Sequence, residues 1–222
     1  MAKNDMHREW ALKTRGQEES GALVESVVEI LDCAALCFTE MGFQGTSIDD
    51  VARRLGATKG RIYHYFRSKT DLFFEVHREG MRRLMDAVNE AMSAGGTGRE
   101  KLVRMLEAHA LTMMQNIAYE AVVVQGVHMH RLGATTPEQR ISLDELMDIR
   151  HKFELLFVEA FRQGQADGSI RQDADVSLAV KGMLGAVNWM AIWYRPRSGE
   201  SPEQQRAMAR RITELQIGGI AG

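Results

Sequence analysis

Apolar residues recur every three or four positions through almost the whole chain, and no stretch alternates apolar and polar residues as a surface strand does. Proline occurs only at Pro137, Pro196 and Pro202, between apolar-periodic stretches, where helices begin or end. The sequence therefore predicts an all-α fold, with a flexible joint in the glycine-rich stretch 93–98. The expected helices cover about residues 21–41, 46–55, 58–66, 68–91, 99–117, 119–131, 138–166, 175–194 and 202–217.

Composition narrows the class of protein further. The 222 residues are 45% hydrophobic and 26% charged, as in a globular protein large enough to bury a core. Cys33 and Cys37 stand four apart on an expected helix, and we interpret them as packing residues rather than a redox pair or metal ligands. We identify no membrane-spanning stretch and no secretory signal, and residues 1–19 read as a flexible mixed-charge arm. We therefore expect a cytoplasmic protein with no membrane partner.

The net charge of −2 is unevenly distributed along the chain. Residues 43–70 contain six Lys and Arg residues and two Asp residues, whereas the stretches before and after them are acidic on balance. Such a basic segment is typical of a surface that binds a polyanion. The alternative is a solvated helix surface with no charged partner.

Helix start and stop signals divide this basic segment into short elements. Gly42 and Gly56 are placed to end helices. The stretches 46–49 and 68–71 have the spacing of capping boxes, with Thr46 as the first cap. A short helix, a turn around Gly56 and the helix 58–66 then form a helix-turn-helix pattern, whose second helix enters the major groove of DNA.

The helix 58–66, TKGRIYHYF, has an apolar side and a polar side when its residues are placed 100° apart. Ile62, Tyr65 and Phe66 fall on the side that can pack on other helices. We predict that Lys59 and Arg61 reach base edges and that the remaining polar groups bind phosphates. An ordinary surface helix is the alternative. The full set of predicted DNA contacts is Thr46, Ser47, Arg53, Thr58, Lys59, Gly60, Arg61, Tyr63, His64 and Lys69.

Residues 30–76 resemble the N-terminal domain of the TetR family of transcriptional regulators. The matching segments, at fixed spacing, are Met41-Gly42-Phe43, Gly45-Thr46-Ser47-Ile48, Val51-Ala52, Leu55-Gly56, Lys59-Gly60, Tyr63-His64-Tyr65-Phe66 and Ser68-Lys69. The resemblance implies a DNA-binding domain at residues 20–67, and a connector helix with a dimerising, ligand-binding domain at 68–222. It also implies a repressor that a small molecule releases from a palindromic operator in double-stranded DNA. Arg61 stands where the family often has Thr or Ser, so another member's operator does not transfer.

The expected helix 175–194 carries small residues followed by Trp189 and Trp193 at three- to four-residue spacing. This face allows close helix approach and then broad apolar burial. With a stripe on the last helix, it predicts a homodimer in which two helices of each chain form a four-helix bundle. The alternative is that both helices complete the monomer core. The predicted interface residues are Ala179, Gly182, Ala186, Trp193, Met208, Ile212 and Leu215.

Fourteen methionines suggest adaptable apolar packing, and we predict a ligand pocket with a few polar groups that orient the ligand. Ordinary core packing is the alternative. The side chains of His128 and His130 point about 200° apart on a helix, so they do not predict a metal site. Because no catalytic motif is present, we expect neither enzyme activity nor a cofactor. The predicted pocket residues are Met85, Met113, Gln125, His128, Met129, Arg150, Phe153, Asn188 and Trp189.

A narrower resemblance covers Arg150-His151, the helix end 164–168 and the stretch 188–203. These residues resemble the C-terminal domain of TetR relatives that regulate lipid, sterol or aromatic-acid catabolism, several of which respond to acyl-CoA thioesters. For such a ligand Arg150, Lys152 and Arg195 are candidate phosphate contacts. Two alternatives stay open: an efflux-type regulator that senses a hydrophobic compound, and a DNA-architectural protein without sequence preference.

Overall fold

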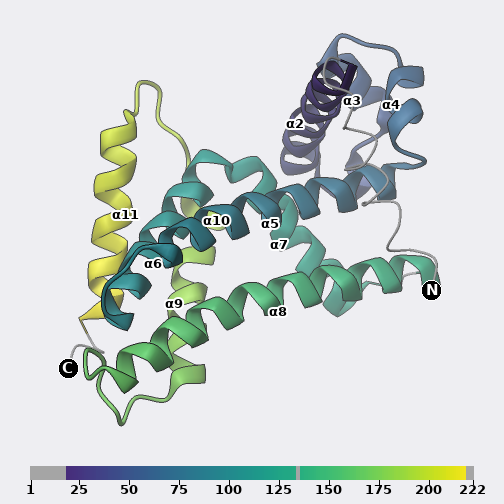
Figure 1. The fold of residues 1–222 in the computed structure, drawn as a ribbon. Helices are drawn as coiled ribbons and strands as arrows, with labels where there is room; N and C mark the ends of the chain where they lie inside the picture. Colours follow the sequence, from purple (N-terminus) through teal and green to yellow (C-terminus); the bar gives the residue numbers. More distant parts are fainter. Residues whose placement is uncertain (1–18, 134–135, 219–222) are drawn as a thin grey trace. The chain divides into compact units, whose positions relative to one another are not determined.

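The computed structural model describes residues 19–133 and 136–218, and helices are the regular elements in that range (Figure 1). The predicted all-α fold is confirmed. The helices are α2 (Glu19–Gly45), α3 (Ile48–Leu55), α4 (Lys59–Tyr65), α5 (Lys69–Ser93), α6 (Gly98–Gln115), α7 (Ile117–Leu132), α8 (Pro137–Ala166), α9 (Val176–Asn188), α10 (Met190–Trp193) and α11 (Pro202–Ile217).

The chain divides into two compact units between Val76 and His77, inside α5. The sequence-based boundary at 67–68 lies before this helix. The arm predicted at residues 1–19 lies outside the described residues, except that Glu19 begins α2.

The first unit packs α2, α3, α4 and the start of α5 around an aromatic centre. The rings of Phe38 and Phe73 meet edge to face with their centroids 5.1 Å apart, and both side chains are fully buried. The helical backbone breaks at Gly42 (φ 70°, ψ 169°), and Gly56 beyond α3 is left-handed (φ 67°, ψ 29°). Both glycines therefore interrupt helices as predicted, and they set α3 and α4 as a short packed pair.

The cap of α3 lies one residue later than predicted. Ser47, not Thr46, is the N-cap: its Oγ accepts a hydrogen bond from the Asp50 amide (3.2 Å). In return Asp50 Oδ2 accepts from the Ser47 amide (2.9 Å). Thr46 is buried, and its hydroxyl donates to the carbonyls of Gly42 (2.7 Å) and Cys37 (3.1 Å). Thr46 thus satisfies carbonyls that the break in α2 leaves without helical partners.

In the second unit α6 is the central helix, packed against α8, α9 and α11. The helix predicted at 175–194 is in fact two helices, because the chain tightens at Trp189. There the amide of Ile192 bonds to the carbonyl of Trp189, three residues earlier, at 2.9 Å. Apolar periodicity does not detect such a local change of pitch. Side chains buried in this unit include Leu102, Met105, Leu106, Phe157, Phe161, Val180 and Val187.

Gly98, predicted to belong to a flexible joint, is instead a packing residue. It begins α6, and its amide donates to Asp167 Oδ2 at 2.7 Å. A Cβ at this position would lie 2.0 Å from Gly164 N and 2.6 Å from the Ala160 carbonyl oxygen. The start of α6 therefore rests directly on the backbone of α8.

The substitution Gly98→Ala should lower the free energy of unfolding by about 3 kcal/mol, because a backbone neighbour cannot move aside as a side chain can. Urea unfolding of the purified protein measures this change. Gly95→Ala is the matched control, since its Cβ would meet no heavy atom within 4 Å, and its effect should stay within about 0.5 kcal/mol. Equal effects of the two substitutions would contradict the close approach of α6 and α8.

Candidate DNA-binding and ligand-binding sites

Helix α4 has the two sides that its sequence predicts. Ile62 and Phe66 are buried against the first unit's core, while Lys59, Tyr63 and His64 are exposed. The His64 ring also packs edge to face on Tyr65, with a centroid distance of 4.8 Å. A cation, a phenol and an imidazole thus stand on one solvent-facing side of a helix, all able to donate hydrogen bonds to a phosphate or a base edge.

Arg61 is directed differently from the base-reading role that we predicted. Its Nη2 pairs with Glu29 Oε2 at 2.7 Å and donates to Ser26 Oγ at 3.3 Å, both on α2. The guanidinium therefore ties α4 to α2. A contact between Arg61 and a base would require these bonds to break.

Two other predicted DNA contacts are part of the scaffold. Thr46 is buried with its hydroxyl and amide both bonded to carbonyls, so the predicted phosphate contact does not fit it. Lys69 Nζ donates to the Phe43 carbonyl at 2.8 Å and lies 4.6 Å from the centre of the Phe43 ring. These two side chains fix the end of α2, where the break at Gly42 leaves carbonyls to be satisfied.

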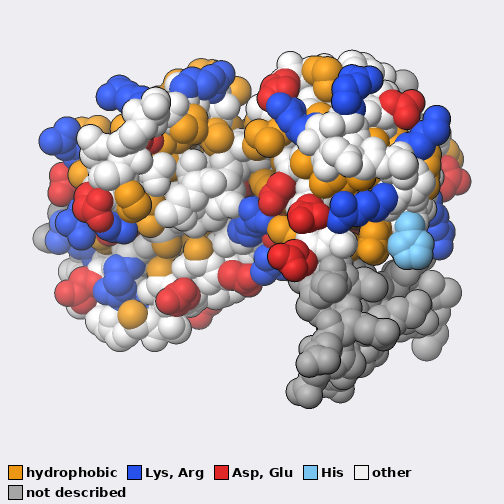
Figure 2. Space-filling model, turned by 90° about the horizontal axis from the view of Figure 1, so that it is seen from above, with side chains coloured by type: hydrophobic (Ala, Val, Ile, Leu, Met, Phe, Trp, Pro, Cys, Tyr) orange, Lys and Arg blue, Asp and Glu red, His pale blue; other side chains and the backbone are white. Residues whose placement is uncertain are grey.

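The remaining predicted DNA contacts lie at the surface. Ser47 and Thr58 are exposed at the N-cap positions of α3 and α4, and Gly60 is exposed in α4. Arg53 pairs with Asp50 at 3.0 Å, yet its side chain is 77% exposed. On the face of the molecule in Figure 2, Lys and Arg side chains alternate with acidic and apolar ones and form no single block. The net positive charge of residues 43–70 therefore does not extend across this face as one continuous patch.

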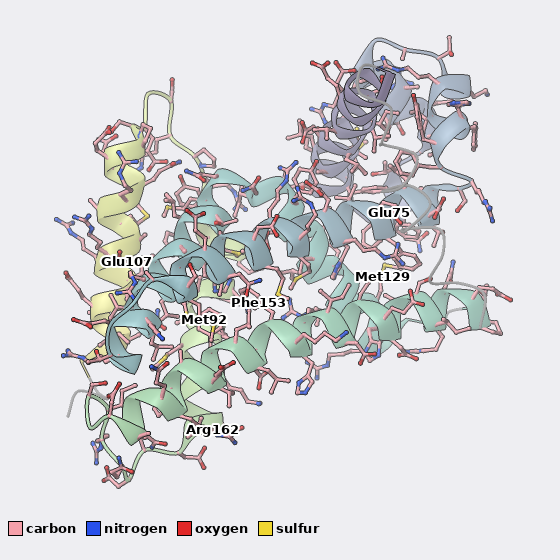
Figure 3. The ribbon with its side chains drawn as sticks, viewed as in Figure 1. Glu75, Met92, Glu107, Met129, Phe153 and Arg162 are labelled. Carbon is pink, nitrogen blue, oxygen red and sulfur yellow. The ribbon has the colours of Figure 1, made fainter. Side chains whose placement is uncertain are left out.

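The second unit contains a cavity of about 350 Å³ bounded by α5, α8 and α9. Arg150, Phe153 and Asn188, all predicted pocket residues, line it. Phe153 lies on the inner side of α8, whereas Arg162 lies on its outer side (Figure 3). The other lining residues are Met81, Leu84, Met147, His151, Glu154, Lys181, Leu184 and Gly185.

Other predicted pocket residues lie elsewhere. Trp189 is 61% exposed and His128 is also exposed, so neither is enclosed in a pocket. Met113 is packed in the core away from this cavity's lining, and Met85, Gln125 and Met129 are half-buried without lining it. Helical phase alone could not separate these positions, because it shows which side of a helix is apolar but not whether that side lines the cavity or packs elsewhere.

A buried polar group behind this cavity was missed by the sequence analysis. His77, His109 and Glu120 are all buried, and both ring nitrogens of each histidine and Oε1 of Glu120 lack a well-formed hydrogen bond. Burial, reinforced by the positive charge of Arg150, lowers the pKa of both histidines to about 3. Burial raises the pKa of Glu120 to about 8, although the charges of Arg150 and Arg83 oppose that shift. At neutral pH all three are therefore uncharged.

One sequence signal could have revealed this polar group. Gly126 of α7 lies against His77, and a Cβ there would come within 2.5 Å of His77 Cδ2. Gly80 of α5 likewise lies 3.6 Å, measured from its ideal Cβ, from Glu120 Oε1. Glycine inside a long apolar helix signals a close neighbour, and Glu120 is a single acid in the apolar run 117–124.

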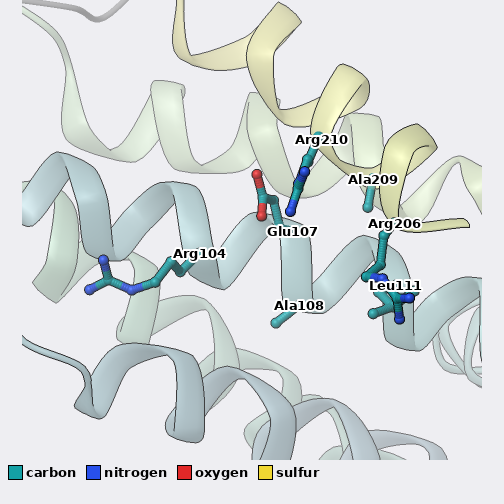
Figure 4. A pocket seen from close by; sticks show the side chains of 7 residues that line it. All are labelled: Arg104, Glu107, Ala108, Leu111, Arg206, Ala209 and Arg210. Atoms are coloured by element: carbon teal, nitrogen blue, oxygen red, sulfur yellow. The ribbon is translucent and has the colours of Figure 1, made fainter. Parts of the chain in front are cut away.

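A second hollow of about 220 Å³ lies between α6 and α11 (Figure 4). Three arginines line it, but Arg104 donates to the carbonyls of Ala94 (3.0 Å) and Gly95 (2.7 Å). Arg206 pairs with Glu203 at 2.6 Å, and Glu107 adds an acid to the same wall. This hollow is therefore a weaker candidate anion site than the cavity lined by Arg150.

Helices α9 and α10 expose an apolar face to solvent. Leu178 is 73% exposed, and Trp189, Ile192 and Trp193 are exposed beside the small residues Gly182 and Ala186. On α11 Leu215 is 86% exposed. Of the predicted interface residues, Ala179, Met208 and Ile212 are half-buried and pack on their own core, as the alternative interpretation of these helices expected.

The same apolar face bears on our sequence-based statement that the chain has no membrane-spanning stretch. The window Val176–Trp193 has a mean hydropathy of 1.3, and by length and composition it qualifies as a membrane-crossing helix. A single such window is weak evidence, since helices of soluble proteins also meet the criterion. Within residues 19–133 and 136–218, no group of three His, Cys, Asp or Glu side chains is placed to hold a metal ion.

Comparison with known proteins gives the family. Residues 30–76 match the model of bacterial regulatory proteins of the tetR family, and residues 95–220 match the tetracyclin repressor-like C-terminal domain. This chain belongs to the TetR family. As in that family, it is a helix-turn-helix transcriptional regulator that binds operator DNA as a homodimer.

Individual relatives match over most of the chain. The HTH-type transcriptional repressor KstR2 of Rhodococcus jostii is 29% identical over 196 residues, which are 87% of this chain and 90% of that protein. The structure of PfmR from Thermus thermophilus is 30% identical with a TM-score of 0.72, covering 85% of this chain and 97% of PfmR. AibR in complex with isovaleryl coenzyme A and operator DNA is 24% identical with a TM-score of 0.67, covering 86% of this chain and 97% of AibR.

Glu120 should make stability fall as the pH rises. Its folded-state pKa of about 8 exceeds the ordinary value of 4.5, so the folded state holds a proton that the unfolded state has lost. The two histidines act in the opposite direction, but only below their ordinary pKa of 6.5. Between pH 6.5 and 8 the Glu120 contribution should therefore remove about 2 kcal/mol of unfolding free energy.

The substitution Glu120→Gln should abolish that decline, because an amide does not titrate. Urea unfolding at pH 6.5, 7.2 and 8.0 measures the slope for each protein. Glu159→Gln, at an exposed position of α8, should keep the decline of the parent protein. A slope unchanged by Glu120→Gln would show that another group is responsible.

Proposed function

We propose that this protein is a repressor whose homodimer binds a palindromic operator through the exposed side of α4 and leaves it when a small effector enters the cavity of the second unit. The observation that carries the effector part is Arg150. It is a half-buried cation that lines the cavity, and it has no hydrogen bond or ion pair among the described residues. A cation partly removed from water in this way is suited to an anionic or oxygen-rich ligand.

On DNA, we assign base-edge contacts to Lys59 and the close approach of the backbone to Gly60. Tyr63 and His64 donate to phosphate oxygens from the same side of α4. Ser47 and the first amides of α3 favour a second phosphate, because the N-terminus of a helix carries partial positive charge. Two such units in a dimer read two half-sites about one helical turn apart.

For the effector, we propose an acyl-CoA thioester. AibR has been solved with isovaleryl coenzyme A and operator DNA, and another similar structure is described as a ketosteroid regulator. The cavity lies near the lower end of known ligand-pocket volumes, about 300–1,000 Å³. It therefore suits an acyl group, with the CoA phosphates outside it near exposed cations such as Lys152.

We place the protein in the cytoplasm and propose no enzymatic activity, because its relatives are transcriptional regulators. The exposed face of α9 and α10 is proposed as part of the homodimer interface, with Gly182, Ala186, Trp193 and Leu215 at the surface for it. An efflux-type regulator that senses a hydrophobic drug is the second candidate for the effector class. The mainly apolar cavity wall favours it, whereas the unpaired Arg150 does not.

The substitution Lys59→Ala should weaken binding to the protein's own upstream DNA and lower the slope of log affinity against log salt by about 1, since one phosphate or base contact is lost. Fluorescence anisotropy with a labelled duplex at several salt concentrations measures both quantities. Lys152→Ala, an exposed lysine of the second unit, is the control and should change neither. Equal binding by a random duplex would instead identify a non-specific DNA-architectural protein.

Effector class is tested by release of the preformed protein–DNA complex. Micromolar acyl-CoA thioesters should lower the anisotropy, while CoA alone, free fatty acids and cationic drugs should leave it unchanged. The melting temperature of the free protein should rise with the same compounds, because a ligand of the folded state stabilises it by mass action. Release by drugs and not by thioesters would establish the efflux-type alternative.

A further inference from the structure

The charge of Arg150 is not balanced by any acid that surrounds it. Two carboxyl groups lie close enough to act on its pKa, those of Glu120 and Glu154. Glu154 is already paired with Lys181, with Oε1 and Nζ 2.5 Å apart. Glu120 is buried and holds its proton at neutral pH. The cavity therefore contains a cation whose partner is missing from the described protein.

Arg150 is accompanied by further polar groups. Asn188 also lines the cavity, and the polar contact of its side chain is with the imidazole of His109. Behind the lining residue Phe153, the buried His109 packs edge to face on that ring at 5.1 Å. Neither nitrogen of His109 has a well-formed hydrogen bond, although Asn188 is near enough to act on it. Arg150 and Asn188 thus line a cavity that also contains the Glu154–Lys181 ion pair and apolar side chains such as Met81 and Leu84.

Groups of this kind cost stability when they are left unpaired in the interior. A purely hydrocarbon ligand would increase that cost, because it would displace water from Arg150 and Asn188 without replacing the hydrogen bonds. A ligand oxygen would satisfy both side chains, since guanidinium and amide groups donate to the same acceptor.

We propose that Arg150 and Asn188 form a subsite for an acceptor oxygen, a carboxylate or a ketone, at the inner end of the effector's acyl group. The effector is then an oxo- or carboxy-substituted acyl compound rather than a plain fatty acyl compound. This inference rests on the proposed function, because it assigns the part of the effector that enters the cavity.

The thioester carbonyl is a poor candidate for this subsite. An acyl chain with its thioester at Arg150 would have to extend past that residue toward the buried side chains of His77, His109 and Glu120. With the CoA phosphates outside, the end of the acyl group remote from sulfur meets Arg150. The oxygen that binds there must therefore belong to the acyl group itself.

Three CoA thioesters of equal chain length test this assignment: hexanoyl-CoA, 5-oxohexanoyl-CoA and adipoyl-CoA. Isothermal titration calorimetry should give roughly tenfold to hundredfold tighter binding for the two substituted compounds, as expected for a charge-assisted hydrogen bond. The carboxylate should bind tighter than the ketone. Equal binding of all three would overturn the subsite and leave an acyl-CoA-responsive repressor intact.

Variants decide whether Arg150 is responsible. Arg150→Met should reduce the preference for the substituted compounds to nearly one while hexanoyl-CoA binds as before, which also shows that the variant is folded. Asn188→Leu should reduce the preference in part. Arg162→Met removes an exposed cation of α8 that does not line the cavity, and it should leave the preference intact. A preference that survives Arg150→Met would overturn the proposal.

The free acids separate this inference from the proposed function. Hexanoate, 5-oxohexanoate and adipate are titrated in parallel against the parent protein and Arg150→Met. Tighter, Arg150-dependent binding of the substituted acids with no binding of any thioester would support the subsite and overturn the acyl-CoA assignment. No binding of any of the six compounds would overturn both.

Discussion

The second unit buries three polar side chains in their uncharged forms, and the packing of its helices depends on this constraint. His77, Glu120 and His109 lie in the interior of a helical bundle, where charged forms are strongly disfavoured. Glycines at positions 80 and 126 allow α5 and α7 to close over two of these side chains, since a methyl group at 126 would overlap the His77 ring. These helices enclose polar side chains beside the cavity lined by Arg150, where we propose that the effector binds.

The sequence predicted those parts of the fold that depend on local chemistry. Gly42 and Gly56 interrupt helices because a left-handed or extended glycine is needed there, and this requirement is legible from the residues alone. The exposed side of α4 follows from the phase of Ile62 and Phe66 in the same way. Within residues 19–133 and 136–218, helix periodicity likewise located the helices except where Trp189 changes the pitch.

Sequence analysis is least informative where a side chain has a partner distant in sequence. Lys69 satisfies a carbonyl 26 residues earlier, and Arg61 pairs with Glu29, 32 residues away. Both had been assigned to DNA from their charge and their position near a helix end, because nothing local shows that an interior carbonyl or an acid competes for them. The same limit explains Trp189: an amphipathic position can face a pocket or a partner chain, and only the packing of its neighbours separates the two.

Helix α5 carries residues of both functions along one continuous element. Lys69 at its start is bonded to the end of α2, beside the helix-turn-helix, while Met81 and Leu84, about three to four turns later, line the cavity. In the proposed function, a ligand that shifts the wall formed by Met81 and Leu84 would act on this same helix. Such a shift releases DNA only if the ligand binds one conformation more tightly than the other. We propose that Arg150 supplies this difference in affinity. A conformation that buries Arg150 without a ligand is disfavoured, because the guanidinium then has no partner.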